Sequence, residues 1–359
     1  MAINRMSIGG EYPLSTDDLC RHTTPLQLPY LNDFHKVFFA SGRGALRALL
    51  RMINGKSALL PNYICQSVIV AFEQEGYTID FYQINADYSI DIESVKTLVL
   101  AADVLFIMHY FGFPQDQGIL KTLKEACDKN STVIVEDTTH SIFTLPLTCD
   151  TFAVSSLRKW FGLPDGAVAY SNDKCILDIE RFMVEDSNFT NLRLIGMLQK
   201  HAYLSGSSEK PTLHLSLLES AENYLTRHPS LSCISEFSWQ QLCGLKPKKM
   251  IECRRNNYKL LYDAISRGSI NIASPVLDEN TCPLFLVVKT DRRDALRLFL
   301  MEHQIFCPVH WPVEDQRLLE DEGLRENFGN NLSIPIDQRY NNADMRYIAG
   351  VLQEFENYA

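Results

Sequence analysis

The first half of the chain alternates short apolar runs with amphipathic stretches. The runs are rich in β-branched and aromatic residues and have the length of strands, and they lie at 36–40, 57–60, 78–84, 104–110, 132–136, 151–154 and 166–170. Between several of them apolar residues recur with a period near 3.6, which indicates helices. Such alternation is typical of βαβ units, so the pattern predicts an α/β domain built around a mainly parallel sheet.

After Ser171 the pattern becomes mostly helical, with polar segments at 205–211 and 227–232 that are expected to be loops. Four elements near the C-terminus predict a smaller α+β unit: a helix at 248–266, a strand at 283–288, and helices at 292–303 and 342–357. The length of 359 residues suits two domains. We expect them to comprise residues 1–240 and 241–359.

Composition and charge narrow the class of protein. Hydrophobic residues make up 46% of the chain and charged residues 22%, as in an ordinary folded protein. The net charge of -10 disfavours contact with the phosphates of a nucleic acid. Since the sequence shows neither a signal-peptide pattern nor an apolar run long enough for a membrane span, we expect a cytoplasmic protein. The ten cysteines include no CxxC pair, which favours reduced thiols over disulfides or a metal site.

Three segments carry residues suited to binding or catalysis. In the first, a predicted strand passes through Ser41, Gly42, Arg43 and Gly44 straight into a predicted helix. The free N–H groups and the positive dipole at such a helix start suit a phosphate. A tight turn that requires glycine is the alternative interpretation.

The second segment is an apolar strand that ends in Glu136 and Asp137, with His140 three residues later. Ligands of parallel sheets bind beyond the carboxyl ends of the strands, so Asp137 and His140 are expected to face a site. For one of the two acids, a capping role for the next segment is the better explanation.

The third segment is a loop between two predicted strands that contains Ser155, Ser156, Arg158 and Lys159, followed by the turn Asp165-Gly166. A single lysine is usually solvated surface. This one follows another strand end and lies beside hydroxyl groups that could bind a phosphate, which makes it a candidate catalytic residue.

Together these segments resemble the DegT/DnrJ/EryC1/StrS group of pyridoxal phosphate (PLP) aminotransferases. The resemblance covers most of the chain and includes Ile8-Gly9-Gly10-Glu11, Pro61-Asn62-Tyr63, His109-Tyr110-Phe111-Gly112 and the Leu-x-Ile-Pro motif at 332–335. It implies a fold type I transferase with a large PLP-binding domain and a smaller C-terminal α+β domain. It also implies a homodimer with active sites at the subunit interface.

The resemblance also implies roles for individual residues. Lys159 would form the Schiff base with PLP and shuttle a proton. Asp137 would keep the pyridine nitrogen protonated, and His140 would lie near the phenolic oxygen. The phosphate would be held by the turn of Ser41, Gly42, Arg43 and Gly44 and by Ser155 or Ser156.

The sequence departs from the family pattern near the cofactor. Arg43 replaces the usual threonine of the turn, and Val154 stands where a serine precedes the lysine by five residues. Cys65 occupies the position at which an aromatic residue often stacks on the PLP ring, so either Cys65 or Tyr63 is expected to contact the ring. The asparagine-arginine segment that reaches the partner's site in the family is not recognisable around 235–241.

Pro308 and Pro312 flank a late segment that contains His310 and Trp311. In the family the corresponding stretch borders the substrate pocket, which makes both residues candidate substrate contacts, as is Arg158. A packed loop with a satisfied histidine is the alternative.

The resemblance implies an aminotransferase that moves an amino group, from glutamate, to a nucleotide-linked keto-sugar in amino-sugar or polysaccharide biosynthesis. Cations for a nucleotide diphosphate would come from Arg43, Arg158, and Arg254 or Arg255. Two alternatives stay open: a PLP enzyme of another reaction type or with a non-sugar acceptor, and a non-catalytic protein that kept the fold. No metal, membrane or nucleic-acid partner is expected.

Overall fold

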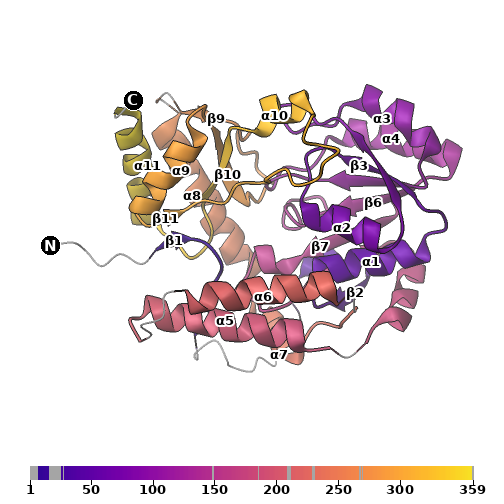
Figure 1. Ribbon diagram of the computed structural model, residues 1–359, viewed down its shortest axis with the longest axis horizontal. Coiled ribbons are helices and arrows are strands. Elements are labelled where there is room, and N and C mark those ends of the chain that lie inside the picture. Colours follow the sequence, from indigo (N-terminus) through magenta and orange to yellow (C-terminus); the bar gives the residue numbers. More distant parts are fainter. Residues whose placement is uncertain are drawn as a thin grey trace.

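A seven-stranded sheet forms the centre of the large unit (Figure 1). The computed structural model describes residues 7–15, 26, 28–147, 149–184, 186–207, 212–228, 231–266, 268 and 270–357. In spatial order the strands are β2 (His35–Phe39), β8 (Ala167–Ser171), β7 (Phe152–Ser156), β6 (Val133–Asp137), β5 (Val104–Met108), β3 (Ser57–Pro61) and β4 (Thr78–Tyr82). Strand β8 is antiparallel to both of its neighbours, whereas β7, β6, β5, β3 and β4 run parallel.

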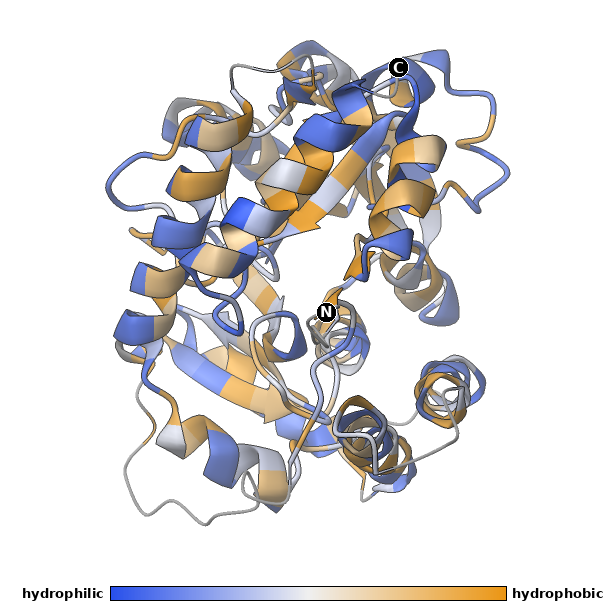
Figure 2. Ribbon diagram, turned by 90° about the vertical axis from the view of Figure 1, so that its left-hand side faces the viewer, coloured by the Kyte–Doolittle hydropathy of each residue, from blue (hydrophilic) through white to orange (hydrophobic). Residues whose placement is uncertain are grey.

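These strands are the seven apolar runs of the sequence, each found within two residues of its predicted bounds. The α/β fold class is therefore confirmed. Helices cover the sheet at α1 (Gly42–Met52), α2 (Gln66–Gln74), α3 (Ile92–Leu98), α4 (Gln117–Asn130), and short 3-10 helices lie at η2 (Pro29–Leu31), η3 (Val99–Ala101), η4 (Leu157–Lys159) and η5 (Lys174–Phe182). Figure 2 shows hydrophobic and hydrophilic residues around the helices, as expected where one face packs on a sheet.

Side-chain caps explain why the helices begin where they do. The side chain of Ser41 accepts a hydrogen bond from the N–H of Gly44, and Asp91 and Asp116 cap α3 and α4 in the same way. The three helix starts are thereby held in place at sheet-to-helix junctions, and the α1 junction becomes important for the site below.

A second sheet lies toward the C-terminus, with the antiparallel order β12 (Asn331–Pro335), β10 (Phe285–Lys289) and β9 (Asn271–Ile272). It has an apolar core of its own, which includes Leu286, Val288, Leu332, Ile334 and residues of the helices α8 (Pro247–Ile265), α9 (Arg293–Glu302) and α11 (Asn342–Asn357). The N-terminal segment joins this unit, because β1 (Ile8–Gly9) pairs in parallel with β11 (Ile305–Phe306).

Two long helices, α5 (Asn188–Leu204) and α6 (Leu213–Arg227), pack side by side below the large sheet (Figure 1). They are followed by α7 (Glu236–Gly244), and α10 (Glu322–Phe328) precedes β12. The division between two domains at residues 240 and 241 stays a prediction; it falls inside α7, while the core of the second sheet draws on α8 and later elements.

Two further observations concern the described part of the chain. No helix there combines the length and the apolar character needed to cross a membrane. The nine cysteines in this part form no disulfide bond with one another, and Cys20 lies outside the described residues.

Candidate active site

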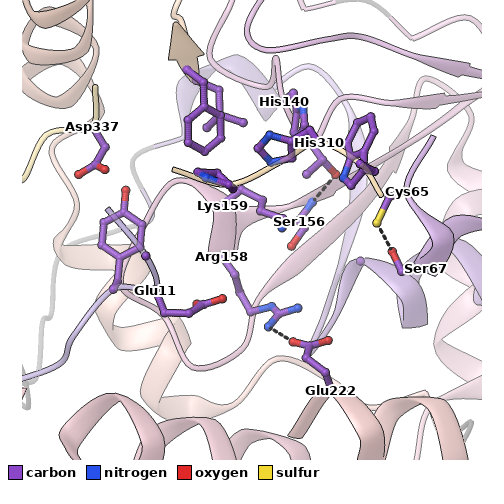
Figure 3. A pocket seen from close by; sticks show the side chains of 18 of the residues that line it. Glu11, Cys65, Ser67, His140, Ser156, Arg158, Lys159, Glu222, His310 and Asp337 are labelled. Atoms are coloured by element: carbon purple, nitrogen blue, oxygen red, sulfur yellow. Dashed lines mark hydrogen bonds and ion pairs between the residues drawn. The ribbon is translucent and has the colours of Figure 1, made fainter. Parts of the chain in front are cut away.

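A cavity of about 630 Å³ opens between the large sheet and the C-terminal unit, a size typical of small-molecule sites. Its floor comes from the carboxyl ends of β6 and β7 and the start of α1. Its opposite wall comes from the N-terminal segment and from loops around β10, β11 and β12. In Figure 3, Cys65 and Ser67 lie on one side of Lys159, and Glu11 and Asp337 on the other.

Lys159 lies at the end of η4, directly after β7, and its side chain is exposed in the cavity. The next residue, Trp160, is fully buried, and its indole N–H donates to the carbonyl oxygen of Thr139 at 2.8 Å. This bond joins the lysine turn to the segment that carries Asp137 and His140. The sequence segments that contain Asp137 and Lys159 therefore meet in one site.

Strand alternation puts the two neighbouring acids on opposite faces of β6. Asp137 lines it, and its Oδ1 accepts a hydrogen bond from the Thr139 N–H at 2.8 Å. Glu136 points away: one oxygen lies 3.0 Å from Nε2 of His109 and the other accepts the N–H of Asp150. Burial raises the pKa of Asp137, so a cationic partner in the cavity would favour its ionised form.

Two histidines lie beside each other over Lys159 (Figure 3). Burial lowers the pKa of His140 well below its usual value, and burial together with the Lys159 charge lowers that of His310 to about 3. Nδ1 of His310 is 2.8 Å from the hydroxyl of Ser333, whereas Nδ1 of His140 is buried without a partner among the described residues. Both rings are therefore neutral near pH 7, and His140 has a ring nitrogen to offer a ligand.

The start of α1 and the end of β7 form an anion cradle. The hydroxyl of Ser156 lines it and has no hydrogen-bond partner within the described chain, although the residue is only 7% exposed. A Cβ on Gly42 would lie 3.2 Å from Cβ of Ser156, so glycine keeps this space open. Because the first N–H groups of a helix lack intrahelical partners, a phosphate here would satisfy both the helix start and the orphaned hydroxyl.

The guanidinium of Arg43 turns away from this cradle toward α6. It donates to the hydroxyl of Thr226 at 2.9 Å and lies 3.8 Å from Glu222. Glu222 also pairs with Arg158 at 3.0 Å (Figure 3) and with Arg193 at 3.2 Å. In this conformation Arg43 offers its backbone N–H, not its side chain, to a group in the cradle.

Sequence reasoning missed Arg193 and Glu222 as cavity residues. They come from α5 and α6, and Arg193 also pairs with Glu11 of the N-terminal segment at 2.8 Å. Burial raises the pKa of Glu222, but the charges of Arg158 and Arg193 lower it overall. No local motif marks these residues, because the cluster forms only when three distant segments meet.

The structure brings most of the sequence-predicted residues together. Those that line the cavity are Ser41, Gly42, Arg43, Cys65, Asp137, His140, Ser156, Arg158, Lys159, His310 and Trp311. Gly44 does not line it; it lies within α1, where its N–H is bonded to Ser41. Ser155 does not line it either, since it is buried and donates to the carbonyl oxygen of Thr138 at 3.4 Å.

Tyr63 lies behind the cavity wall instead of in it. Its ring stacks on Phe328 with centroids 3.8 Å apart, and its hydroxyl donates to the carbonyl oxygen of His310. Tyr63 thus supports the segment 308–312, which carries Trp311. The ring of Trp311 lies 5.5 Å from that of His140 at an interplanar angle of 22°. Cys65 does reach the cavity, with its sulfur 3.1 Å from the hydroxyl of Ser67.

Among the comparisons with known proteins, the one with solved structures found matches. Protein-family models and curated protein sequences gave no match. Among solved structures, Spr1654 from Streptococcus pneumoniae in its PLP form is 14% identical, with a TM-score of 0.71 over 98% of this chain and 99% of that one. The sugar aminotransferase CalS13 from Micromonospora echinospora is 12% identical, with a TM-score of 0.66 over 98% of this chain and 100% of that one.

A DegT DnrJ EryC1 StrS aminotransferase from Brucella abortus is 15% identical, with a TM-score of 0.61 over 90% of this chain and 86% of that one. Since identity is low and coverage nearly complete, what is shared is the whole architecture. The protein therefore has the fold of these aminotransferases, as the sequence resemblance predicts.

Proposed function

We propose that this protein is a PLP-dependent aminotransferase that transfers an amino group, from L-glutamate, to a nucleotide-linked keto-sugar. The observation that carries the proposal is the arrangement of Lys159, Asp137 and the Ser156 cradle around one cavity. The shared fold supports it, since similar structures include a sugar aminotransferase and PLP and PMP forms of Spr1654.

The residues present fit PLP at three points. The phosphate would lie at the start of α1 against the orphaned hydroxyl of Ser156. Asp137 would pair with the pyridine nitrogen, since a cation there offsets the burial that raises the pKa of this carboxyl. Nδ1 of His140, which lacks a partner among the described residues, would face a polar group of the ring. Cys65 lines the cavity where the family has an aromatic residue, and the nearby ring of Trp311 is a second candidate contact.

When bound, PLP supplies an electron sink that makes the proton on the substrate's amino-bearing carbon acidic. Lys159 would hold the cofactor through its side-chain nitrogen and, once displaced by the donor's amine, would accept that proton and return it. Asp137 would keep the ring nitrogen protonated. The aromatic wall of His310 and Trp311, with Phe111 packed against both rings, would exclude water from the reacting carbon.

A spectroscopic experiment tests the proposal. The protein purified with PLP is expected to show the visible absorption band of lysine-bound cofactor, and L-glutamate is expected to convert it to the band of pyridoxamine phosphate. Lys159→Ala is expected to lose the band, whereas Lys248→Ala, a change at an exposed lysine outside the cavity, is expected to keep it. Absence of the band in the unmodified protein would refute the proposal, and a band that no amino donor alters would point to a different PLP reaction.

We further propose that the protein is cytoplasmic and acts as a homodimer with its sites at the subunit interface. The resemblance of the sequence is the main support. Exposed apolar side chains on α5 and α6, among them Ile195 and Leu215, add to it, because they lie on the helices that carry Arg193 and Glu222. Light scattering coupled to size-exclusion chromatography measures the oligomeric state directly.

A further inference from the structure

Arg254, on α8, is a cavity-lining arginine that is only 1% exposed. Its hydrogen-bond partners in the described chain are neutral: the side chain of Gln338 at 2.8 Å, the carbonyl oxygen of Leu284 at 3.1 Å and the hydroxyl of Tyr12 at 3.0 Å. Within the same residues it forms no ion pair at 4.0 Å or less. A buried charge that forms no direct ion pair is costly, so a ligand anion would stabilise this arrangement.

Arg254 has more donors than its three partners take. A guanidinium has five N–H groups. Gln338 takes the one on Nε, and Leu284 and Tyr12 take one from each terminal nitrogen. One N–H therefore remains on each terminal nitrogen, and two such groups that face one carboxylate bind its two oxygens as a fork.

Two charged residues, Asp337 and Arg339, lie at the same end of the cavity as Arg254. Asp337 faces this end of the cavity, but both of its oxygens are bound by Arg339, at 2.7 and 2.9 Å. The charges of Arg339 and Arg254 lower the pKa of Asp337, so that this carboxylate stays ionised. Arg254, Arg339 and Asp337 by themselves sum to +1, a charge that one ligand carboxylate would balance.

Arg254 is also tied to the catalytic segments. Its guanidinium lies 4.7 Å above the ring of Trp160, the residue that follows Lys159. The same indole donates to Thr139, whose N–H donates to Asp137. By contrast, Arg255 points out of the cavity and bonds the carbonyl oxygens of Asp278 and Thr281.

We propose that Arg254 binds a carboxylate of the amino donor. This inference rests on the proposed function, because it names the donor-binding residue of that same site. The sequence left either Arg254 or Arg255 as a candidate cation for a nucleotide diphosphate. The proposal selects Arg254 and assigns it to the amino acid instead.

The test measures binding of glutarate, a dicarboxylate that lacks an amino group and cannot react, to the PLP-loaded protein by calorimetry. Arg254→Gln is expected to raise the Kd for glutarate and the KM for L-glutamate by roughly 10- to 100-fold, the loss expected for charge-assisted hydrogen bonds. Arg254→Lys, which keeps the charge but not the fork, is expected to lie between Arg254→Gln and the unmodified protein. Arg255→Gln, the matched change on the same helix, is expected to alter neither constant.

Retention of the PLP band in each variant shows that the site is folded. An unchanged glutarate Kd in both Arg254 variants would overturn the inference. A raised Kd for uridine diphosphate in the Arg254 variants, with an unchanged Kd for glutarate, would also overturn it, because Arg254 would then bind the nucleotide. Because glutarate binding needs no turnover, failure of the aminotransferase proposal itself would show separately, as a PLP band that no amino donor converts.

Discussion

Gly112 joins the large sheet to the C-terminal unit at a point too close for any side chain. Its φ is +106°, and a Cβ there would lie 2.7 Å from Cα of Pro283 and closer still to the carbonyl oxygen of Cys282. The neighbouring Phe111 carbonyl accepts the N–H of Leu284 at 2.8 Å, so the two units share this backbone contact. Gly112→Ala therefore adds both backbone strain and a steric overlap.

The size of the effect follows from these two parts. A left-handed backbone costs a residue with a Cβ about 1–2 kcal/mol, and forcing a methyl group into packed structure costs about 1–3 kcal/mol more. Gly76 separates the two, because its φ is +77° but a Cβ there would meet nothing within 4 Å. Gly76→Ala is thus expected to lose about 1–2 kcal/mol of unfolding free energy and Gly112→Ala about 2–5 kcal/mol.

Urea unfolding followed by tryptophan fluorescence measures both variants. The overlap falls on Cys282 and Pro283, directly before Leu284, which lines the cavity. Gly112→Ala is therefore expected to weaken PLP binding, while Gly76→Ala leaves it unchanged. If the two variants lost the same stability, or if both kept the PLP affinity of the unmodified protein, the reasoning about the contact at Gly112 would be refuted.

Two other results are expected. Burial lowers the pKa of His310 to about 3, so below about pH 6.5 the unfolded chain binds a proton at His310 while the folded protein does not. The free energy of unfolding therefore falls on acidification. His310→Gln is expected to remove roughly 2 kcal/mol of that loss between pH 6.5 and pH 5, measured by urea unfolding at both pH values. Glu75 pairs with the buried Arg47 at 2.5 Å, so Glu75→Ala is expected to lower the free energy of unfolding by about 3–5 kcal/mol. Glu93→Ala, which breaks the exposed pair with Lys96, is expected to lower it by less than about 1 kcal/mol. Equal losses for the two variants in thermal unfolding would contradict the value for Glu75→Ala.

Much of the fold was predictable because its strands are short apolar runs bounded by polar residues. The same regularity placed Asp137, His140 and Lys159 at strand ends, where a site forms in this kind of sheet. Alternation along a strand also explains why Ser156 lines the cavity while Ser155 is turned toward Thr138. That distinction was available from the sequence once the strand bounds were known.

Other features depended on contacts between distant segments. The choice between Glu136 and Asp137 required the bond from Glu136 to His109. The orientation of Arg43 depends on Glu222, 179 positions further along the chain by the sequence numbering. Tyr63 was a reasonable candidate for ring contact by its position, but Phe328 draws its ring behind the wall. A side chain's direction at such places is decided by partners that no local pattern reveals.

The pairing of β1 with β11 joins residues at opposite ends of the chain, with Ile8 opposite Ile305. The cavity wall that holds Glu11 and Tyr12 also needs Asp337 and Arg339. During synthesis, the strands of the large sheet are complete once Ser171 has emerged, yet the cavity lacks a wall until Arg339, 168 positions later, has left the ribosome. The site is thus assembled later than the sheet, and a nascent chain can form the central sheet well before it can enclose a ligand.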